Sequence, residues 1–237
     1  MALHRAPPAA LEAGPPLTPR IKALVFDFDG LILETESPAY ETWADIYREH
    51  GHELPRDRWV QNIGAAAWPF DALDHLASLV TTPFDREAVK ARREGRKAEI
   101  LAALEAMAGV RDYLRHARRL GLKVGVASSA SDAYVCGHLE RLAVRDGIDA
   151  IVCRERVARG KPFPDLYLRV VEDLGVAADE TIAFEDSPNG IAAAKAAGLR
   201  CVAVPNAITA ELDLSGADLR LDSLGVLSLE GLIARFR

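Results

Sequence analysis

The sequence has few cysteines, and none of its apolar stretches is long enough to cross a membrane. The three cysteines, Cys136, Cys153 and Cys201, match no metal-binding spacing, and an odd number favours free thiols in a reducing compartment. Basic residues are not in excess either, since 29 Lys and Arg face 35 Asp and Glu, for a net charge of −6. This balance argues against nucleic acid or an anionic membrane as a partner. We therefore expect a cytoplasmic protein that binds neither.

Residues 1–20 are rich in proline and alanine and lack the apolar core of a signal peptide. We expect them to form a flexible N-terminal tail outside the fold. The chain as a whole is 49% hydrophobic and 27% charged, which is typical of a globular protein with a sizeable core. Its 237 residues can form one large domain or two small ones.

The stretch Ile21–Leu31 organises the rest of the chain. A short apolar run is followed by Asp27, Asp29 and Gly30, which predicts a buried strand of a parallel sheet that ends in a sharp turn. Open α/β sheets bind their ligands at this end of the strands. Two carboxylates separated by one residue repel each other unless a cation or a proton lies between them. Taken alone, an ordinary Asp-Gly turn explains the pattern equally well.

The rest of the chain alternates between strands and helices, apart from a helical block at residues 36–106. Strands are predicted at 122–127, 150–153, 181–184, 200–204 and 218–221, and helices at 110–120, 133–142, 165–174 and 190–197. This alternation predicts a Rossmann-like α/β fold with a parallel sheet. In the helical block, Ser37-Pro38 is predicted to begin the first helix, with Ser37 as its N-cap. We predict an α/β core of residues 21–34 and 107–237, with an inserted helical cap of residues 35–106.

Polar residues follow the later strands at their carboxyl ends. They are Ser128 and Ser129 after the second strand, Lys161 in the loop after the third, and Glu185 and Asp186 after the fourth. Each has an ordinary explanation as a helix cap, a solvated lysine or an acidic first turn. These explanations do not account for their shared position. Parallel strands align their carboxyl ends, and this would bring all of these residues together beside Asp27 and Asp29.

Such a collection of groups is suited to phosphoryl transfer. Carboxylate oxygens bind Mg²⁺, and a carboxylate can attack phosphorus to form an aspartyl-phosphate. A second carboxyl group can serve as general acid and then as general base. Hydroxyl, backbone N–H and lysine groups can hold the phosphoryl oxygens.

The same motifs resemble those of the haloacid dehalogenase-like (HAD) hydrolase superfamily. The resemblance rests on Phe26–Gly30, Ser128, Gly160–Pro162 and Glu185–Gly190, and it extends from Ile21 to the end of the chain. Within the superfamily, the pattern is similar to the subfamily that contains β-phosphoglucomutase and sugar-phosphate phosphatases. The resemblance implies the HAD fold, with a cap of the four-helix type at the position of the helical block.

The resemblance also implies roles for individual residues. Asp27 would be the nucleophile and a metal ligand, and Asp29 the general acid and base, with its backbone carbonyl on Mg²⁺. Phosphate binding would fall to Gly30, Ser128, Ser129 and Lys161, and the metal site would include Asp27, Asp29, Glu185 and Asp186. Thr35 would lie in a hinge beside the site. The small, uncharged loop at residues 62–68, with Gly64, Ala66 and Trp68, would face the substrate.

These roles predict Mg²⁺-dependent hydrolysis of a small phosphomonoester, such as a sugar or polyol phosphate, through an aspartyl-phosphate. A phosphomutase is an alternative, which is disfavoured because Ala39 replaces the cap histidine of β-phosphoglucomutase and the facing loop has no basic residue. A phosphonatase is disfavoured because residues 36–89 contain no lysine for a Schiff base. The alternative from another class is a non-catalytic binding module that retains the fold. We expect a small phosphorylated metabolite as partner and a monomer or weak homodimer.

Overall fold

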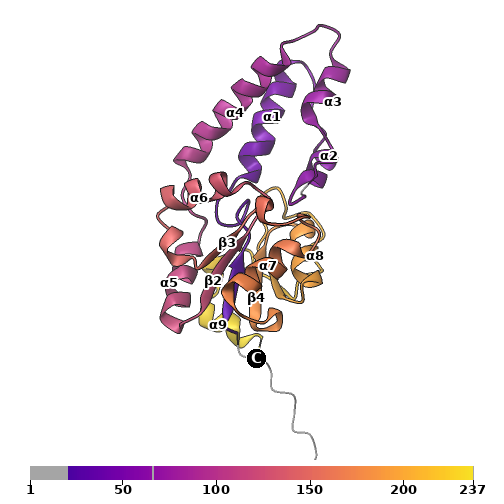
Figure 1. Ribbon diagram of the computed structural model, residues 1–237. Helices are drawn as coiled ribbons and strands as arrows, with labels where there is room; N and C mark the ends of the chain where they lie inside the picture. The colour runs from indigo at the N-terminus through magenta and orange to yellow at the C-terminus, as the bar shows by residue number, and fades with distance from the viewer. Residues whose placement is uncertain (1–20, 66, 237) are drawn as a thin grey trace, which may run out of the picture.

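The computed structural model describes residues 21–65 and 67–236. Their strands form one six-stranded sheet in the order β3-β2-β1-β4-β5-β6, and every neighbouring pair is parallel (Figure 1). The predicted parallel α/β fold is therefore confirmed. The strands are β1 Ala23–Phe26, β2 Lys123–Ala127, β3 Ala150–Val152, β4 Thr181–Glu185, β5 Arg200–Ala203 and β6 Leu219–Arg220.

The first strand lies at the centre of the sheet, between β2 and β4, and is buried on both faces. Leu24 and Phe26 point into one apolar cluster, which includes residues of the helices α5 Val110–Leu120, α6 Asp132–Arg141 and α9 Leu229–Ala234. Ala23 and Val25 point into the opposite cluster, which includes α7 Asp165–Leu174 and α8 Pro188–Ala196. Because both faces are covered, β1 is apolar throughout rather than alternating.

The helical block extends beyond the carboxyl ends of the strands (Figure 1). Its elements are α1 Glu36–Glu49, α2 Arg56–Trp59, the 3₁₀ helix η1 Val60–Asn62, α3 Ala72–Leu79 and α4 Arg86–Ala103. Its buried apolar residues, among them Trp43, Tyr47 and Leu76, form a cluster separate from the two beside the sheet. We retain the division into a core (21–34 and 107–237) and a cap (35–106) as a proposal that this separate cluster supports.

The start of α1 differs from the prediction. The helix begins at Glu36, so Thr35 occupies the N-cap position and Ser37 is not the N-cap. The carboxylate of Glu34 instead accepts hydrogen bonds from the N–H groups of Glu36 and Ser37, at 3.0 and 3.1 Å, and from the Ser37 hydroxyl at 2.9 Å. A negative carboxylate suits the free N–H groups at a helix start. The Glu34 side chain therefore caps α1, in place of the predicted Ser37.

Other boundaries differ by a few residues, and one helix was not predicted. α3 begins after Asp71, whose side chain accepts a hydrogen bond from the Asp74 N–H. The six-residue helix α9 is too short to show a clear helical period. The remaining short elements are the 3₁₀ helices η2 Arg145–Gly147, η3 Arg154–Arg156, η4 Ala178–Glu180 and η5 Leu224–Val226. Among the described helices, none combines the length and the apolar character that a bilayer requires.

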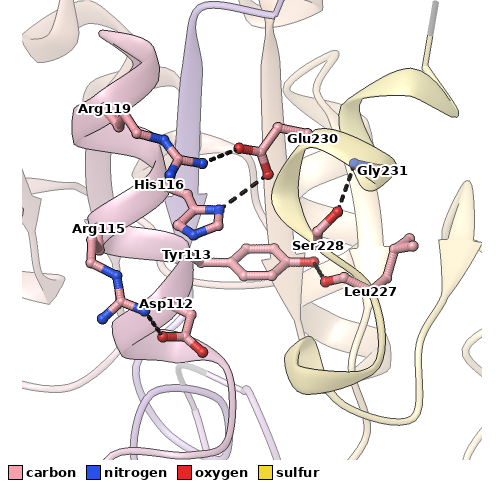
Figure 2. Close-up of polar contacts among 9 residues, drawn as sticks. All are labelled: Asp112, Tyr113, Arg115, His116, Arg119, Leu227, Ser228, Glu230 and Gly231. Carbon is pink, nitrogen blue, oxygen red and sulfur yellow. Dashed lines mark hydrogen bonds and ion pairs between the residues drawn. The ribbon is translucent and has the colours of Figure 1, made fainter.

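The last helix is joined to α5 by polar contacts (Figure 2). The Tyr113 hydroxyl donates a hydrogen bond to the backbone carbonyl of Leu227 at 3.0 Å. The carboxylate of Glu230 pairs with His116 at 3.1 Å and with Arg119 at 2.6 Å. The Ser228 side chain caps α9 by accepting a hydrogen bond from the Gly231 N–H at 3.1 Å. These contacts hold the C-terminal segment against the sheet layer, at a distance from the carboxyl ends of the strands.

The Glu230 contacts give stability a pH dependence that can be measured. The Glu230 backbone N–H, His116 and Arg119 lower the pKa of the Glu230 carboxyl from 4.5 to about 2. Because the pKa is lowered in the folded protein, the Glu230 contacts stabilise the fold fully above pH 4.5. This stabilisation is lost as the pH falls towards 2. We expect Glu230→Gln to lower the Tm slightly at pH 7, because exposed pairs contribute little. At pH 3, the difference in Tm between Glu230→Gln and the wild type should be smaller than at pH 7.

Differential scanning calorimetry at the two pH values checks this prediction. Asp112→Asn is the matched control, because Asp112 pairs with Arg115 within α5 and forms no ion pair with a second element among residues 21–65 and 67–236. A Glu230→Gln difference that is as large at pH 3 as at pH 7 would contradict the assignment.

Candidate active site

The turn after β1 places Asp27 and Asp29 at the carboxyl end of the sheet. The Asp27 N–H donates to the Phe184 carbonyl at 2.9 Å, so the pairing with β4 continues one residue beyond the strand. Gly30 has a φ of +72°, and a Cβ at this position would lie 2.2 Å from Asp186 Oδ2. Only glycine fits a turn that is both left-handed and so crowded. The Gly30 N–H donates to Thr35 Oγ1 at 3.1 Å, which ties the turn to the start of α1.

Lys161 lies between acidic groups at the carboxyl ends of β1 and β4. Its Nζ is 2.6 Å from Asp27 Oδ1 and 2.6 Å from Glu185 Oε1, and only 1% of its side chain is exposed. Asp186 is buried beside them. The structure therefore brings together the aspartate of the first motif, the lysine of the third and the acidic pair of the fourth.

Positive charge is scarce in this cluster. Three carboxylates, those of Asp27, Glu185 and Asp186, lie close together. The ammonium group of Lys161 contacts two of them, Asp27 and Glu185. Burial, followed by the charge of Asp27, raises the pKa of Glu185 to about 7 and that of Asp186 well above its usual range. Burial alone would lower the pKa of Lys161, but the charges of Asp27 and Glu185 raise it. The lysine stays protonated, and the carboxylates lack sufficient counter-charge.

The cluster has the donors that a divalent cation requires. One oxygen from each of Asp27, Glu185 and Asp186 lies within 4.8 Å of the others. Glu185 Oε2 is buried and has no hydrogen-bond partner among the residues that the structure describes. Hard carboxylate oxygens suit Mg²⁺, and cation binding would restore the ionised form of the two acids with raised pKa values. The side chain of Asp29 lies outside this group, so its contribution through the backbone carbonyl stays a prediction.

Asp29 lies at the wall of the cavity rather than in the carboxylate cluster. Burial and the charge of Asp27 raise the pKa of Asp29 to about 6, although the Thr35 hydroxyl acts in the opposite direction. The hydroxyl of Tyr134 lies 3.5 Å from Asp29 Oδ1. A carboxyl group with a pKa near neutrality can both donate and accept a proton, as a general acid and base must.

A cavity of about 370 Å³ lies between the sheet and the helical block. This is the size of a pocket for a small metabolite. Its lining includes the predicted residues Asp27, Asp29, Thr35, Gly64, Trp68, Ser129 and Lys161. Ser128 is fully buried at the end of β2, and its hydroxyl accepts a hydrogen bond from the Ala130 N–H at 3.0 Å. Ala66 lies outside the described residues.

The loop before α3 rests on the start of α8 and closes one side of the cavity. The Asn189 side chain donates to the Ile63 carbonyl at 2.8 Å. At Gly64, where φ is +68°, a Cβ would lie 2.2 Å from Ser187 Oγ. Asn62 exchanges two hydrogen bonds with the Phe70 backbone, at 2.8 and 3.1 Å, so its amide is used to hold the loop.

Five polar residues that were not predicted from the sequence also line the cavity: Glu36, Lys97, Ser131, Tyr134 and Arg154. Burial, followed by the charge of Asp29, raises the pKa of Glu36 to about 8. Glu36 could have been suspected because it follows Thr35 directly. Lys97 belongs to α4 and reaches the cavity only through the packing of the helices. Because a lysine of the helical block lines the cavity, the absence of lysine from residues 36–89 does not disfavour a phosphonatase.

Asn206 is a further missed residue, and it holds Asp186 from the next strand. Its Nδ2 donates to Asp186 Oδ2 at 2.7 Å, while its amide oxygen accepts from the N–H groups of Ile208 and Thr209. The two backbone donors determine which way the amide faces. A signal was available, because Asn206 follows β5 at the carboxyl end where the polar residues after the other strands were recognised.

The chain is similar in sequence to a known family of hydrolases and to several phosphatases. A family model described as haloacid dehalogenase-like hydrolase matches residues 24–204. A Bacillus subtilis (strain 168) protein described as "Putative phosphatase YhcW" is 42% identical over 88% of this chain and 94% of its own. The fructose-1-phosphate phosphatase YqaB of Escherichia coli (strain K12) is 29% identical over 78% of this chain and 97% of its own.

Among solved structures, a variant of CbbY from Rhodobacter sphaeroides in complex with xylulose-(1,5)bisphosphate is similar to this chain. It superimposes with a TM-score of 0.67 and is 27% identical, over 90% of this chain and 99% of that one. The family model spans most of the sheet and all four motifs, from β1 to the residue after β5. The chain therefore belongs to the haloacid dehalogenase-like hydrolases.

Proposed function

We propose that this protein is a Mg²⁺-dependent phosphatase that hydrolyses a small phosphomonoester of the sugar- or polyol-phosphate class. The observation that carries the proposal is the buried Asp27, in contact with Lys161 and grouped with Glu185 and Asp186, at the wall of a cavity of metabolite size. A location in the cytoplasm and a monomer or weak homodimer remain part of the proposal.

The residues divide the reaction between them. The Asp27 carboxylate attacks phosphorus and forms an aspartyl-phosphate, while Asp29 gives its proton to the leaving alcohol oxygen. Asp29, now ionised, takes a proton from a water molecule whose oxygen attacks the aspartyl-phosphate. Inorganic phosphate leaves, and both aspartates return to their initial state. Lys161, Ser128, Ser129 and the N–H groups near Gly30 hold the phosphoryl oxygens. A bound Mg²⁺ would neutralise the clustered negative charge.

The substrate class is supported by the cavity and by the relatives. Trp59, Ala39 and Trp68 form an apolar side, and Glu36, Lys97 and Arg154 add charged groups to the lining. Such a lining can accept a ring through its apolar face and bind hydroxyl or anionic groups through the charged side chains. The named activity of YqaB is on fructose 1-phosphate, and CbbY was solved with a sugar bisphosphate.

The alternatives are less well supported. Ala39 lines the cavity at the position where β-phosphoglucomutase has its cap histidine, and the described lining residues include no histidine, which disfavours a mutase. A non-catalytic module would have no need to keep an aspartate, a lysine and two further carboxylates buried together, because burying charged groups is costly.

The first test concerns the nucleophile. We expect Asp27→Asn to lower phosphate release by about 10³-fold or more, because an amide does not replace the carboxylate as nucleophile. The fold should persist, since the change removes one of several mutually repelling charges. Phosphate release and Tm are measured together. Asp149→Asn is the control, since Asp149 binds the Val124 N–H at the other end of the sheet. Wild-type turnover by folded Asp27→Asn would refute the role.

The second test concerns the cation. We expect a chelator to remove the activity, Mg²⁺ to restore it, and Ca²⁺ to restore it poorly, because Ca²⁺ prefers longer bonds and a higher coordination number. The measurement is turnover of the same enzyme sample before chelation, after it and after each addition. Full turnover in the chelator would show that the carboxylate cluster works without a divalent cation.

The third test concerns Trp68, which lines the cavity although 61% of its surface is exposed. We expect Trp68→Ala to raise KM severalfold for hexose phosphates and to leave kcat/KM for acetyl phosphate unchanged, because the small substrate does not reach the ring. Phe163→Ala, which removes another exposed aromatic side chain, is the control. An unchanged profile across both substrates would show that Trp68 does not contact the substrate.

A further inference from the structure

Tyr167 is a buried residue of α7 to which the reaction proposed above assigns no part. Its ring is packed in the apolar cluster between the sheet and the helices α7 and α8, with no exposed surface. Its hydroxyl reaches the end of β4 and donates a hydrogen bond to Glu185 Oε1. A phenol has an ordinary pKa near 10, so it stays a hydrogen-bond donor at neutral pH.

The contact places Tyr167 beside two members of the carboxylate cluster. Glu185 Oε1 is also 2.6 Å from Lys161 Nζ, which lies 5.6 Å from the centre of the Tyr167 ring. Lys161 is shared with Asp27 at the same distance. The tyrosine therefore supplies the one neutral hydroxyl contact to Glu185 among the hydrogen bonds that the structure describes.

The second oxygen of Glu185 has different surroundings. Glu185 Oε2 is buried and has no hydrogen-bond partner among the described residues. On the α8 side, Gly190 leaves space for the carboxylate, because a Cβ there would lie 1.9 Å from Oε2. The carboxylate is thus held by one oxygen, while the other is free to bind a cation.

We propose that Tyr167 is a positioning residue that orients Glu185 for the divalent cation, an inference that rests on the cation-dependent function proposed above. Without the hydroxyl, Lys161 would be the remaining donor to Glu185 Oε1, and the carboxylate could rotate about its last bond. The cation would then have to reorient a buried ligand on binding. Groups that hold a metal ligand in this way typically contribute about 10- to 100-fold to metal affinity.

The test is the binding of Mg²⁺ to Tyr167→Phe in the absence of substrate, measured by isothermal titration calorimetry. We expect a Kd about 10- to 100-fold higher than in the wild type. At saturating Mg²⁺, KM for the substrate should stay near the wild-type value, because Tyr167 does not line the cavity. The substitution removes one oxygen and keeps the ring, so the core packing is retained.

Tyr113→Phe is the matched control. It removes another buried tyrosine hydroxyl, which binds the Leu227 carbonyl on the opposite face of the sheet (Figure 2). We expect this variant to have a lower Tm and an unchanged Kd for Mg²⁺. An equal loss of Mg²⁺ affinity in both variants would mean a general effect of lost core hydrogen bonds and would overturn the inference.

A double-mutant cycle shows whether Tyr167 acts through Glu185. In a Glu185→Gln background, Tyr167→Phe should weaken Mg²⁺ binding no further. Wild-type Mg²⁺ affinity in Tyr167→Phe, or a full additional loss in the double variant, would refute the inference about Tyr167. A wild-type protein that binds no Mg²⁺ would instead refute the proposed function, so the two failures are distinguishable.

Discussion

The repulsion between buried carboxylates at the carboxyl end of the sheet is the constraint on which the site depends. Asp27, Glu185 and Asp186 approach one another with Lys161 as the ammonium group in contact, and no such cluster is stable in a dry interior without strong compensation. The raised pKa values of Glu185 and Asp186 express this cost. A bound divalent cation would relieve it, which links cation affinity, proton release and stability.

The sheet can impose this arrangement because its central strands are held firmly on both sides. β1 pairs in register with both β2 and β4, and the rings of Phe26 and Phe184 stack with their centres 4.7 Å apart. The apolar clusters on the two faces anchor the strands, so the polar residues that follow them are brought close together. The burial of the strands thus provides the free energy that opposes the repulsion at their ends.

Small residues and neutral donors complete the arrangement. Gly30 and Gly190 are placed where a side chain would overlap Asp186 or Glu185. Asn206 and Tyr167 each donate to one oxygen of these two acids. A buried carboxylate without such donors would be free to rotate or to take up a proton. Precise placement of the carboxylates therefore depends on residues that do not belong to the cavity lining.

The sequence by itself determined the fold and the members of the central cluster. The apolar run before Asp27 and the regular alternation of strands and helices predicted a parallel sheet, and such a sheet aligns its strand ends. Glu185 and Asp186 were predictable in this way because they stand at the carboxyl end of β4, and Lys161 because it lies in the loop that follows β3. Asn206 follows β5 in the same way and was equally predictable. These features are local in sequence, and so they could be predicted.

Other features were decided by the tertiary structure alone. Lys97, Tyr134 and Arg154 reach the cavity because α4, α6 and the loop after β3 pack around it, and no local pattern distinguishes them from solvated side chains. The N-cap of α1 was predicted wrongly because serine is the better cap by propensity, whereas Glu34 is positioned by the turn after β1. The partner of the Tyr167 hydroxyl likewise depends on how α7 lies against β4. Contacts between elements distant in sequence are set by packing, which the sequence pattern does not describe.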